Sequence, residues 1–221
     1  MRSVKSLRGR RARLDCDAIV EVADGIIARA GPQALTLRAV AKELGATPMA
    51  LYRHVPDKDA LLVLVLDAAY ERLPRPRWPR EPRNRLIAIW SHLHDSLARY
   101  PWVVDALLNS DTVAKAVLPD IEAILEASLA AGLSLEQAAH LYRTIWQHTV
   151  GELVVHRASA GRSTLQKSAV LRTMKTAPPQ RFPLLAKAAP HWAAMRARSL
   201  YRDGLTALVD AALSTARESR R

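Results

Sequence analysis

The stretch TLRAVAKELGATPMALYRH, residues 36 to 54, is the most informative about how the N-terminal part of the chain folds. Thr36 can cap a first helix, in which Val40 and Leu44 share one face that must be buried. Gly45 follows directly, and glycine adopts the positive φ that commonly ends a helix without steric cost. The pattern predicts a helix, a tight turn and a second short helix, which is a helix-turn-helix.

The second helix of this motif is predicted over Pro48 to His54. Thr47 offers a side-chain oxygen to its free N–H groups, and proline is tolerated in a first turn because no N–H is needed there. Leu51 and Val55 lie four residues apart and can pack back on the first helix. The residues left pointing outward are Met49, Ala50, Tyr52, Arg53 and His54. That outward face suits a DNA groove, the alternative being an ordinary helical hairpin.

The apolar spacing predicts an all-α chain with three parts. The segment 1–14 holds six basic and no acidic residues and is expected to be a flexible basic arm, which either reaches DNA or aids solubility. Residues 15–57 form the helix-turn-helix DNA-binding domain, with a further amphipathic helix from Asp15 to Ala30. Residues 58–221 form a larger helical domain, to which a fourth helix over 58–73 connects.

Composition agrees with a DNA-binding protein. Among 221 residues, 33 basic and 21 acidic side chains give a net charge of +12, which favours polyanions, although charge alone fits RNA or an anionic membrane equally. No apolar run approaches the roughly 18 residues that span a bilayer, so we expect a soluble protein without a membrane partner. The single cysteine, Cys16, excludes an internal disulfide and fits a reducing cytoplasm. We expect it to be a partly buried helix residue, with a thiol switch as the alternative.

The rest of the chain is divided by prolines and glycines. Four prolines in PRPRWPREP, residues 74–82, exclude a regular helix and predict a linker. A mobile loop is expected over about 159–180, and the stretch 153–202 has ten basic and no acidic residues. That stretch is either a solvated basic face or a surface that attracts an anionic ligand or lies near DNA. Further helices are predicted over 84–100, 102–108, 113–131 with a fresh start near Leu118, 134–158 with a Ser134–Gln137 capping box, and from about His191.

The sequence LYRHVPDKDALL, residues 51–62, directly after a helix-turn-helix resembles the TetR family of one-component bacterial repressors. The resemblance covers about residues 15 to 70, and the stretch from Arg181 to Leu213 resembles the closing helix of a tetracycline-repressor-type C-terminal domain. It implies that the larger helical domain, residues 58–221, is a ligand-binding and dimerisation domain. The homodimer would pair through the long helix from Ser134 and the last helix from about His191. It also implies a repressor that binds a palindromic double-stranded DNA operator and is released by a small hydrophobic or aromatic effector.

The resemblance assigns DNA contacts to individual residues. Arg38 corresponds to an arginine that contacts a base or a phosphate, and Arg53 replaces an aromatic residue of the tetracycline repressors, so the operator is expected to differ. Pro48, Met49 and Ala50 lie at the helix tip, where apolar atoms can meet thymine methyl groups. The full set expected to face DNA is Arg38, Thr47, Pro48, Met49, Ala50, Tyr52, Arg53, His54 and Lys58.

An effector pocket is expected among the inward faces of the central helices. Its candidate residues, each of which can equally be ordinary core, are Leu66, Tyr70, Trp90, His94, Trp102, Leu107, Trp146, Gln147, His148 and Glu152. An apolar pocket with a few polar groups suits a small hydrophobic or aromatic molecule. Tetracycline itself is not expected, because Leu73 and Pro74 stand where that subgroup has a histidine.

The sequence does not indicate an enzyme. It lacks a glycine-rich phosphate loop, a nucleophile elbow and the HExxH and CxxC patterns, so no cofactor and no metal site are expected. His92 and His94 are two residues apart and face different sides of a helix, which does not suit a shared ion. The remaining alternative is a DNA-binding regulator or architectural protein whose C-terminal domain only dimerises or binds a partner protein.

Overall fold

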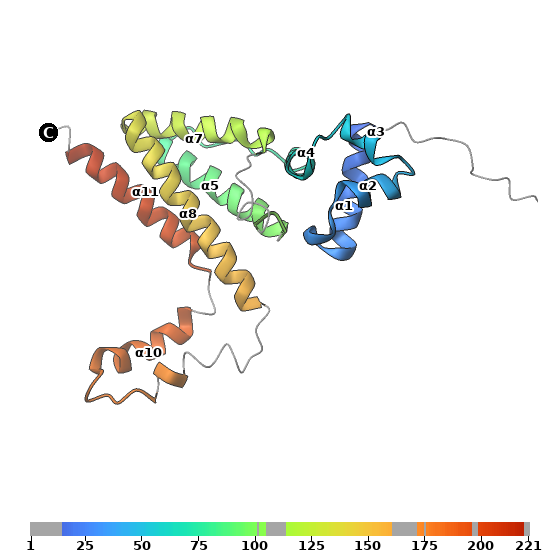
Figure 1. Ribbon diagram of the computed structural model, residues 1–221. Coiled ribbons are helices and arrows are strands. Elements are labelled where there is room, and N and C mark those ends of the chain that lie inside the picture. Colours follow the sequence, from blue (N-terminus) through green and yellow to red (C-terminus); the bar gives the residue numbers. More distant parts are fainter. Residues whose placement is uncertain are drawn as a thin grey trace, which may run out of the picture. The chain divides into compact units, whose positions relative to one another are not determined.

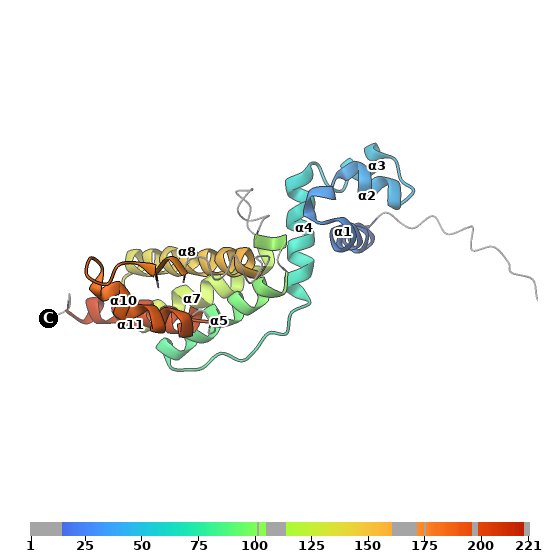
Figure 2. The same ribbon diagram turned by 90° about the horizontal axis from the view of Figure 1, so that it is seen from below.

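The described part of the chain is largely helical (Figures 1 and 2). The computed structural model describes residues 15–100, 102–104, 114–160, 172–174, 176–195 and 199–218, and these ranges contain no β-strand. The all-α prediction is therefore confirmed. The basic arm over 1–14, Leu107 and most of the loop expected over about 159–180 lie outside the described residues.

The described chain forms two compact units. The first contains the chain up to Arg75 together with Trp102–Pro119, and the second contains Pro76–Pro101 and the chain from Asp120 onward. A domain boundary between residues 57 and 58 remains a prediction. The first unit holds α1 (Cys16–Ala30), η1 (Pro32–Ala34), α2 (Leu37–Glu43), α3 (Pro48–Tyr52), α4 (Lys58–Glu71) and η2 (Lys115–Val117).

The helix-turn-helix forms as predicted because its signals are local. The Thr36 hydroxyl accepts a hydrogen bond from the N–H of Ala39 at 3.1 Å and caps α2. Gly45 has a φ of +64°, so the turn uses the conformation that glycine adopts freely. The Thr47 hydroxyl then accepts from the N–H of Ala50 at 3.2 Å and caps α3. Each cap satisfies an N–H group that has no partner inside its helix.

Two predicted helices of this unit are shorter than expected. The second helix of the motif was expected to reach His54, but α3 ends at Tyr52, and Arg53 and His54 form a turn. Pro56 disfavours a helical conformation at the residue before it, so the chain must leave the helix here. Similarly α4 ends at Glu71 instead of residue 73, just before Pro74.

Cys16 is exposed, which corrects the expectation of a partly buried side chain. It is the first residue of α1, capped by the Asp15 carboxylate, which accepts from the N–H of Ala18 at 2.9 Å. The buried face of α1 begins only at Ile19. A cysteine in the first turn therefore lies before the apolar stripe.

The second unit is a helical bundle made of α5 (Pro82–Arg99), most of α7 (Leu118–Ala130), α8 (Leu135–Ala160), α10 (Pro183–Met195) and α11 (Tyr201–Glu218). In it α5, α8 and α11 pack against one another (Figures 1 and 2). The linker over 74–82 is non-helical up to Glu81, whose carboxylate caps α5 through the N–H groups of Arg83 and Asn84. No helix within the described ranges is long and apolar enough to cross a membrane.

The start of α8 confirms the predicted capping box. The Ser134 N–H donates to the Gln137 side chain at 2.9 Å, and the Gln137 N–H donates to the Ser134 hydroxyl at 3.2 Å. The predicted fresh start near Leu118 is also confirmed, since η2 ends at Val117 and α7 begins at Leu118.

The expected single closing helix is wrong. The chain forms α10 up to Met195 and a separate α11 from Tyr201, with Ser199 and Leu200 non-helical between them. Tyr201 is almost fully buried, at 2% exposure, and its hydroxyl contacts α5 and α8. These tertiary contacts fix where α11 starts, so helical spacing alone could not locate the break.

Candidate DNA-binding and effector-binding sites

The short helix α3 has one buried face and one exposed face. Leu51 is fully buried, and Val55, four residues on, is 2% exposed. Met49 is 70% exposed and Tyr52 is 46% exposed, three residues apart and therefore on neighbouring positions of the helix surface. Two large side chains are thus exposed on a helix whose opposite face packs in the core.

Cationic side chains accompany this exposed face. Arg38 on α2, Arg53 after α3 and Lys58 at the first position of α4 are all exposed, and none of the three forms an ion pair within the described part of the chain. The neighbouring Glu43, in contrast, is engaged by Arg29 at 2.5 Å. The face therefore presents uncompensated positive charge, which attracts phosphates and lets side chains approach base edges.

The capping threonine of α3 keeps one polar function available. The Thr47 oxygen accepts from the Ala50 N–H, but its own O–H can still donate. Thr47 is exposed, so a phosphate oxygen can accept that hydrogen bond. The remaining members of the predicted set lie on the same short segment, with Pro48 and His54 exposed and Ala50 half-buried.

Four of the predicted effector residues meet around one residue that the sequence did not indicate. The Tyr201 ring stacks on His94, with centroids 3.9 Å apart, and lies parallel to His148 at 5.3 Å. The Tyr201 hydroxyl shares a 2.8 Å hydrogen bond with Thr149 and donates to the carbonyl oxygen of Trp90 at 3.2 Å. Glu152 joins through His94. We call this group the Tyr201 cluster.

Within the Tyr201 cluster, His94 lies between the carboxylates of Glu152 and Asp95. Its Nε2 is 2.8 Å from a Glu152 oxygen and its Nδ1 is 3.1 Å from an Asp95 oxygen. The pKa of Tyr201 is raised to about 12, chiefly by burial; the Thr149 hydrogen bond opposes this shift, and the charges of Asp95 and Glu152 add to it. The tyrosine hydroxyl therefore stays protonated and acts as a donor to the Trp90 carbonyl.

His148 contributes packing as much as polarity. Its Nε2 is 3.4 Å from the Tyr201 carbonyl oxygen, and a Cβ on Gly204 would lie 2.8 Å from the imidazole. Gly204 is thus the residue that lets α8 and α11 approach each other here.

The other effector candidates are not members of the Tyr201 cluster. Gln147 is exposed on α8 and Trp146 is half-buried. Tyr70, Trp102 and Leu66 belong to the first compact unit, where Leu66 is core at 5% exposure. The sequence missed Tyr201 because its partners are separated from it by 52 and 111 residues, and no local pattern marks such contacts.

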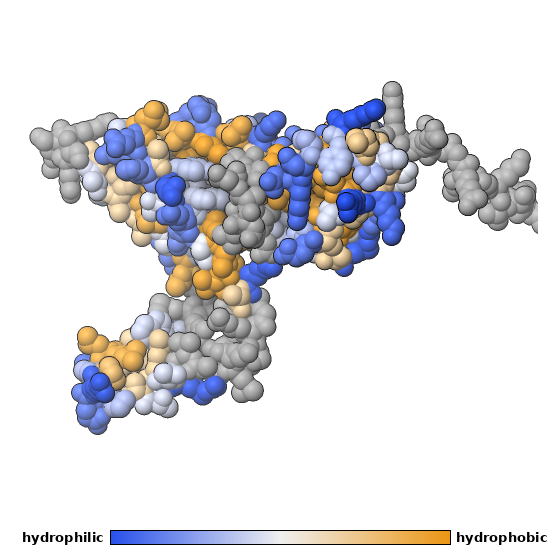
Figure 3. All heavy atoms as spheres, in the orientation of Figure 1, coloured by the Kyte–Doolittle hydropathy of each residue, from blue (hydrophilic) through white to orange (hydrophobic). Residues whose placement is uncertain are grey.

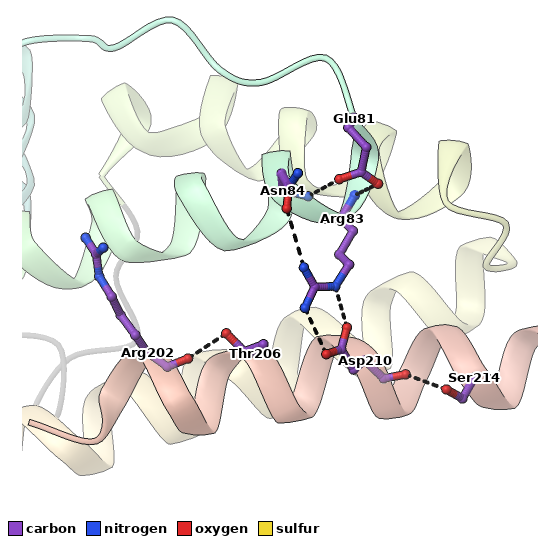
Figure 4. A network of polar contacts seen from close by, with 7 residues as sticks. All are labelled: Glu81, Arg83, Asn84, Arg202, Thr206, Asp210 and Ser214. Carbon is purple, nitrogen blue, oxygen red and sulfur yellow. Dashed lines mark hydrogen bonds and ion pairs between the residues drawn. The ribbon is translucent and has the colours of Figure 1, made fainter.

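A second polar network joins α5 to α11 (Figure 4). Arg83 donates from Nε and Nη2 to both carboxylate oxygens of Asp210, at 2.5 and 2.9 Å. This hydrogen bonding to Arg83 lowers the pKa of Asp210, against a smaller opposing effect of desolvation, and the same contact raises the pKa of Arg83. The paired geometry fixes α5 along α11.

Comparison with known proteins matches both parts of the chain. Residues 19–65 match "Bacterial regulatory proteins, tetR family", and residues 76–210 match "Tetracyclin repressor-like, C-terminal domain". The chain is 30% identical over 135 residues to the HTH-type transcriptional repressor DrrR1 of Streptomyces coeruleorubidus, covering 58% of this chain and 48% of that protein. It is 29% identical over 142 residues to an HTH-type transcriptional regulator of Saccharopolyspora erythraea, covering 62% and 58%. The chain thus spans about half the length of the curated relatives it matches.

Solved structures share the fold. The Streptomyces coelicolor TetR family protein ActR in complex with actinorhodin superposes with a TM-score of 0.79 at 24% identity, covering 94% of this chain and 99% of that one. The two family matches together cover both compact units and include α3, the Tyr201 cluster and the Arg83–Asp210 pair. The chain therefore belongs to the TetR family of bacterial regulatory proteins, with a tetracycline-repressor-like C-terminal domain.

Proposed function

We propose that the chain is a transcriptional repressor that binds a palindromic DNA operator as a homodimer and is released by a small hydrophobic or aromatic effector. The observation that carries the DNA part is the exposed face of α3, where Met49 and Tyr52 stand in solvent at 70% and 46% exposure. Large exposed side chains on a helix packed against the core suit a major groove, as do Arg38, Arg53 and Lys58, which form no ion pair with other described residues.

Dimerisation is proposed through the outer faces of α8 and α11. On α11 the exposed residues Asp203, Ala207 and Ala211 recur every four positions and so share a face. On α8 a comparable exposed face includes Gln147, Gly151 and Val154. Small residues on both helices allow close helix packing between two protomers. A dimer would present two copies of α3, and helix-turn-helix dimers read half-sites about 34 to 36 Å apart.

An effector site is proposed at the Tyr201 cluster. Trp90 is fully buried, and its Nε1 has no hydrogen-bond acceptor among the described residues. Unpartnered buried donors are uncommon and costly, so an acceptor atom on a ligand would stabilise this one. The related ActR has been solved in complex with actinorhodin, which supports a small-molecule effector for this fold.

Selection of bound duplexes from random DNA with the full chain tests the operator proposal. We expect recovered sequences to share an inverted repeat whose half-sites lie about one helical turn apart or a multiple of it. Recovery of unrelated sequences, or of a single unrepeated half-site, would contradict a dimeric operator-binding repressor.

The effector proposal is tested with planar aromatic compounds in matched pairs, such as 9-fluorenone and fluorene, which differ by one acceptor oxygen. We expect the ketone to raise the Tm of the wild-type chain and to weaken operator binding, because ligand binding stabilises the state that it prefers. Trp90→Phe keeps an aromatic ring but removes the N–H, so it should reduce the difference between the two compounds. If no compound of a broader hydrophobic panel changes Tm or operator affinity, the ligand-responsive function is contradicted.

A further inference from the structure

The charge at the Tyr201 cluster differs from the charge of the chain as a whole. The chain carries a net charge of +12, but two carboxylates, Glu152 and Asp95, lie on either side of His94 where α5 and α8 pack together. An imidazole carries at most one positive charge, so His94 can compensate only one of the two. Salt screens charges beyond about 10 Å, so these carboxylates, and not the net charge of the chain, decide which charge on a ligand is favoured here.

Asp95 has a second cationic neighbour, whereas Glu152 has none. Arg202 on α11 lies 3.9 Å from an Asp95 oxygen, and both side chains are mostly exposed, so water and salt screen this pair. Glu152 forms no ion pair with a lysine or an arginine of the described residues, and its partner is Nε2 of His94. Glu152 is therefore the carboxylate of the cluster that lacks a permanent cation.

The Glu152 carboxylate is also largely shielded from water. Its side chain is 22% exposed, and that of His94 is 13% exposed. Removing a carboxylate from water is costly unless a cation and hydrogen bonds compensate its charge. Only Oε2 of Glu152 is engaged, since Oε1 accepts no hydrogen bond from any residue that the structure describes. Each carboxylate oxygen has two lone pairs, so Oε1 is available to a donor from outside the chain.

An independent feature of the same cluster also lacks a partner. Trp90 lies one turn before His94 on α5, so the two residues share a face of that helix. Trp90 is fully buried, and its Nε1 has no acceptor within the described ranges. A free acceptor on α8 and a free donor on α5 therefore belong to one cluster. A ligand with a donor for Glu152 and an acceptor for Trp90 complements both.

We infer that Glu152 makes the effector site selective for cations, so that the effector is an aromatic molecule with a protonated amine that donates to Glu152 Oε1. The inference rests on the proposed effector site at the Tyr201 cluster. A hydrogen bond between two charged groups is about twice as strong as one between neutral groups. An amine therefore gains more at Glu152 than an alcohol of the same shape, and an anion is repelled by the like charge.

Three naphthalene probes of nearly equal size test this inference: 1-naphthylmethylamine is a cation near neutral pH, 1-naphthylmethanol is neutral and 1-naphthoate is an anion. Calorimetric titration of the full chain without DNA avoids binding of the cation to phosphates. We expect the amine to bind about tenfold or more tightly than the alcohol, the factor for about 1.4 kcal/mol, and the naphthoate to bind more weakly than the alcohol. Non-specific attraction to a chain of net charge +12 would give the opposite order.

Glu152→Gln keeps the size of the side chain and an acceptor oxygen but removes the charge. It should bring the affinities of the amine and the alcohol to within about threefold of each other, while the affinity of the alcohol changes by less than about threefold. Glu136→Gln is the matched control, because it removes one negative charge from an exposed position of the same helix, and it should keep the preference for the amine. Circular dichroism establishes that each variant is folded.

The comparison of probes on the wild-type chain needs no variant, so it decides the outcome even if Glu152→Gln unfolds. Binding of the alcohol or the naphthoate as tightly as the amine would overturn the inference and leave a ligand-responsive repressor standing. An unchanged preference for the amine in folded Glu152→Gln would do the same. If no compound of any charge binds, the proposed effector site fails, and this inference fails with it.

Discussion

At the scale of single residues, adjacent positions of α3 differ in role: one side chain packs in the core and the next is exposed. Leu51 is fully buried and anchors the helix, whereas its neighbour Tyr52 is 46% exposed and available to a ligand. Because a helix has 3.6 residues per turn, Leu51 and Tyr52 lie on different faces of α3. The Leu51 face packs in the core, and the Tyr52 face stays exposed. Side chains on that face should therefore act on binding more than on folding.

Two substitutions should separate affinity from base preference. Lys58→Ala removes a proposed phosphate contact, so it should weaken binding to all sequences and lower the slope of log K against log salt by about 1. Tyr52→Ala should also weaken binding to all sequences, and Arg38→Ala should cost about 1–3 kcal/mol at one operator position and relax preference there. Fluorescence anisotropy over a salt series and a set of single-base operator variants measures these effects.

Lys187→Ala, on α10 of the other compact unit, is the control and should leave the salt slope unchanged. Unchanged binding in all three variants at α2, α3 and α4 would contradict the assignment of this face to DNA.

At the scale of elements, the bundle depends on close approaches between α5, α8 and α11. Tyr201 joins all three through its ring and hydroxyl, and the Arg83–Asp210 pair fixes α5 along α11. The apolar end of α10, where Leu184 is 77% exposed, is by comparison little covered by the bundle (Figure 3). Stability should therefore respond to changes at the helix crossings.

Gly204→Ala should destabilise the chain by about 1–3 kcal/mol, the usual cost of overpacking a filled site. The new Cβ would lie 2.8 Å from the His148 ring, which must move away from Tyr201. Urea denaturation measures the change in unfolding free energy. Gly25→Ala on α1 is the matched control, since its Cβ would meet only the flexible end of Arg29, at 3.1 Å. Equal stability of Gly204→Ala and wild type would show that the contact between α8 and α11 accommodates an added methyl group.

The Arg83–Asp210 pair predicts a specific acid sensitivity. Hydrogen bonding to Arg83 lowers the pKa of Asp210 below its ordinary 3.8, so the carboxylate is ionised more easily in the folded chain than in the unfolded chain. Its stabilising contribution is then fully present above the ordinary pKa and is lost as the pH falls through the lower, folded value.

Thermal denaturation between about pH 6 and pH 2.5 measures this contribution, a range that spans ordinary aspartate titration. Asp210→Asn should have a lower Tm than wild type at the upper end, and the two curves should converge as the pH falls. Arg83→Lys, which keeps the charge but loses the two-point geometry, should lie between them. A constant Tm difference across the range would contradict a role for Asp210 ionisation.

At the scale of the whole molecule, the proposed function requires two protomers whose α3 helices bind the operator together. The proposed contact uses exposed faces of α8 and α11, and in one protomer those faces carry small residues such as Ala207 and Ala211. A charge placed there would be desolvated on association without a partner, which is costly.

Ala211→Glu should therefore shift the chain from dimer to monomer in sedimentation and reduce affinity for a full operator at least tenfold, the factor for about 1.4 kcal/mol. Ala98→Glu, on an exposed position of α5, is the matched control and should remain dimeric. A dimeric Ala211→Glu with normal operator affinity would place the interface elsewhere.

Local sequence signals specify the helix-turn-helix and most helix boundaries. The Thr36 and Thr47 caps, the Gly45 turn and the Ser134–Gln137 capping box all join groups within a few residues, so the chain specifies them locally. Helical periodicity also indicated that Met49 and Tyr52 of α3 face outward, whereas Ala50, expected on the same face, is half-buried.

Contacts between residues far apart in the sequence could be found only from the packing of the helices. Tyr201 and Thr149 are 52 residues apart, Asp67 and Ala116 are 49 apart, and Arg83 and Asp210 are 127 apart. Such pairs leave no periodic or spaced signal in one sequence, since they depend on how whole helices pack. For the same reason the break before α11 was missed, because buried contacts of Tyr201, and not local helix propensity, set the start of that helix.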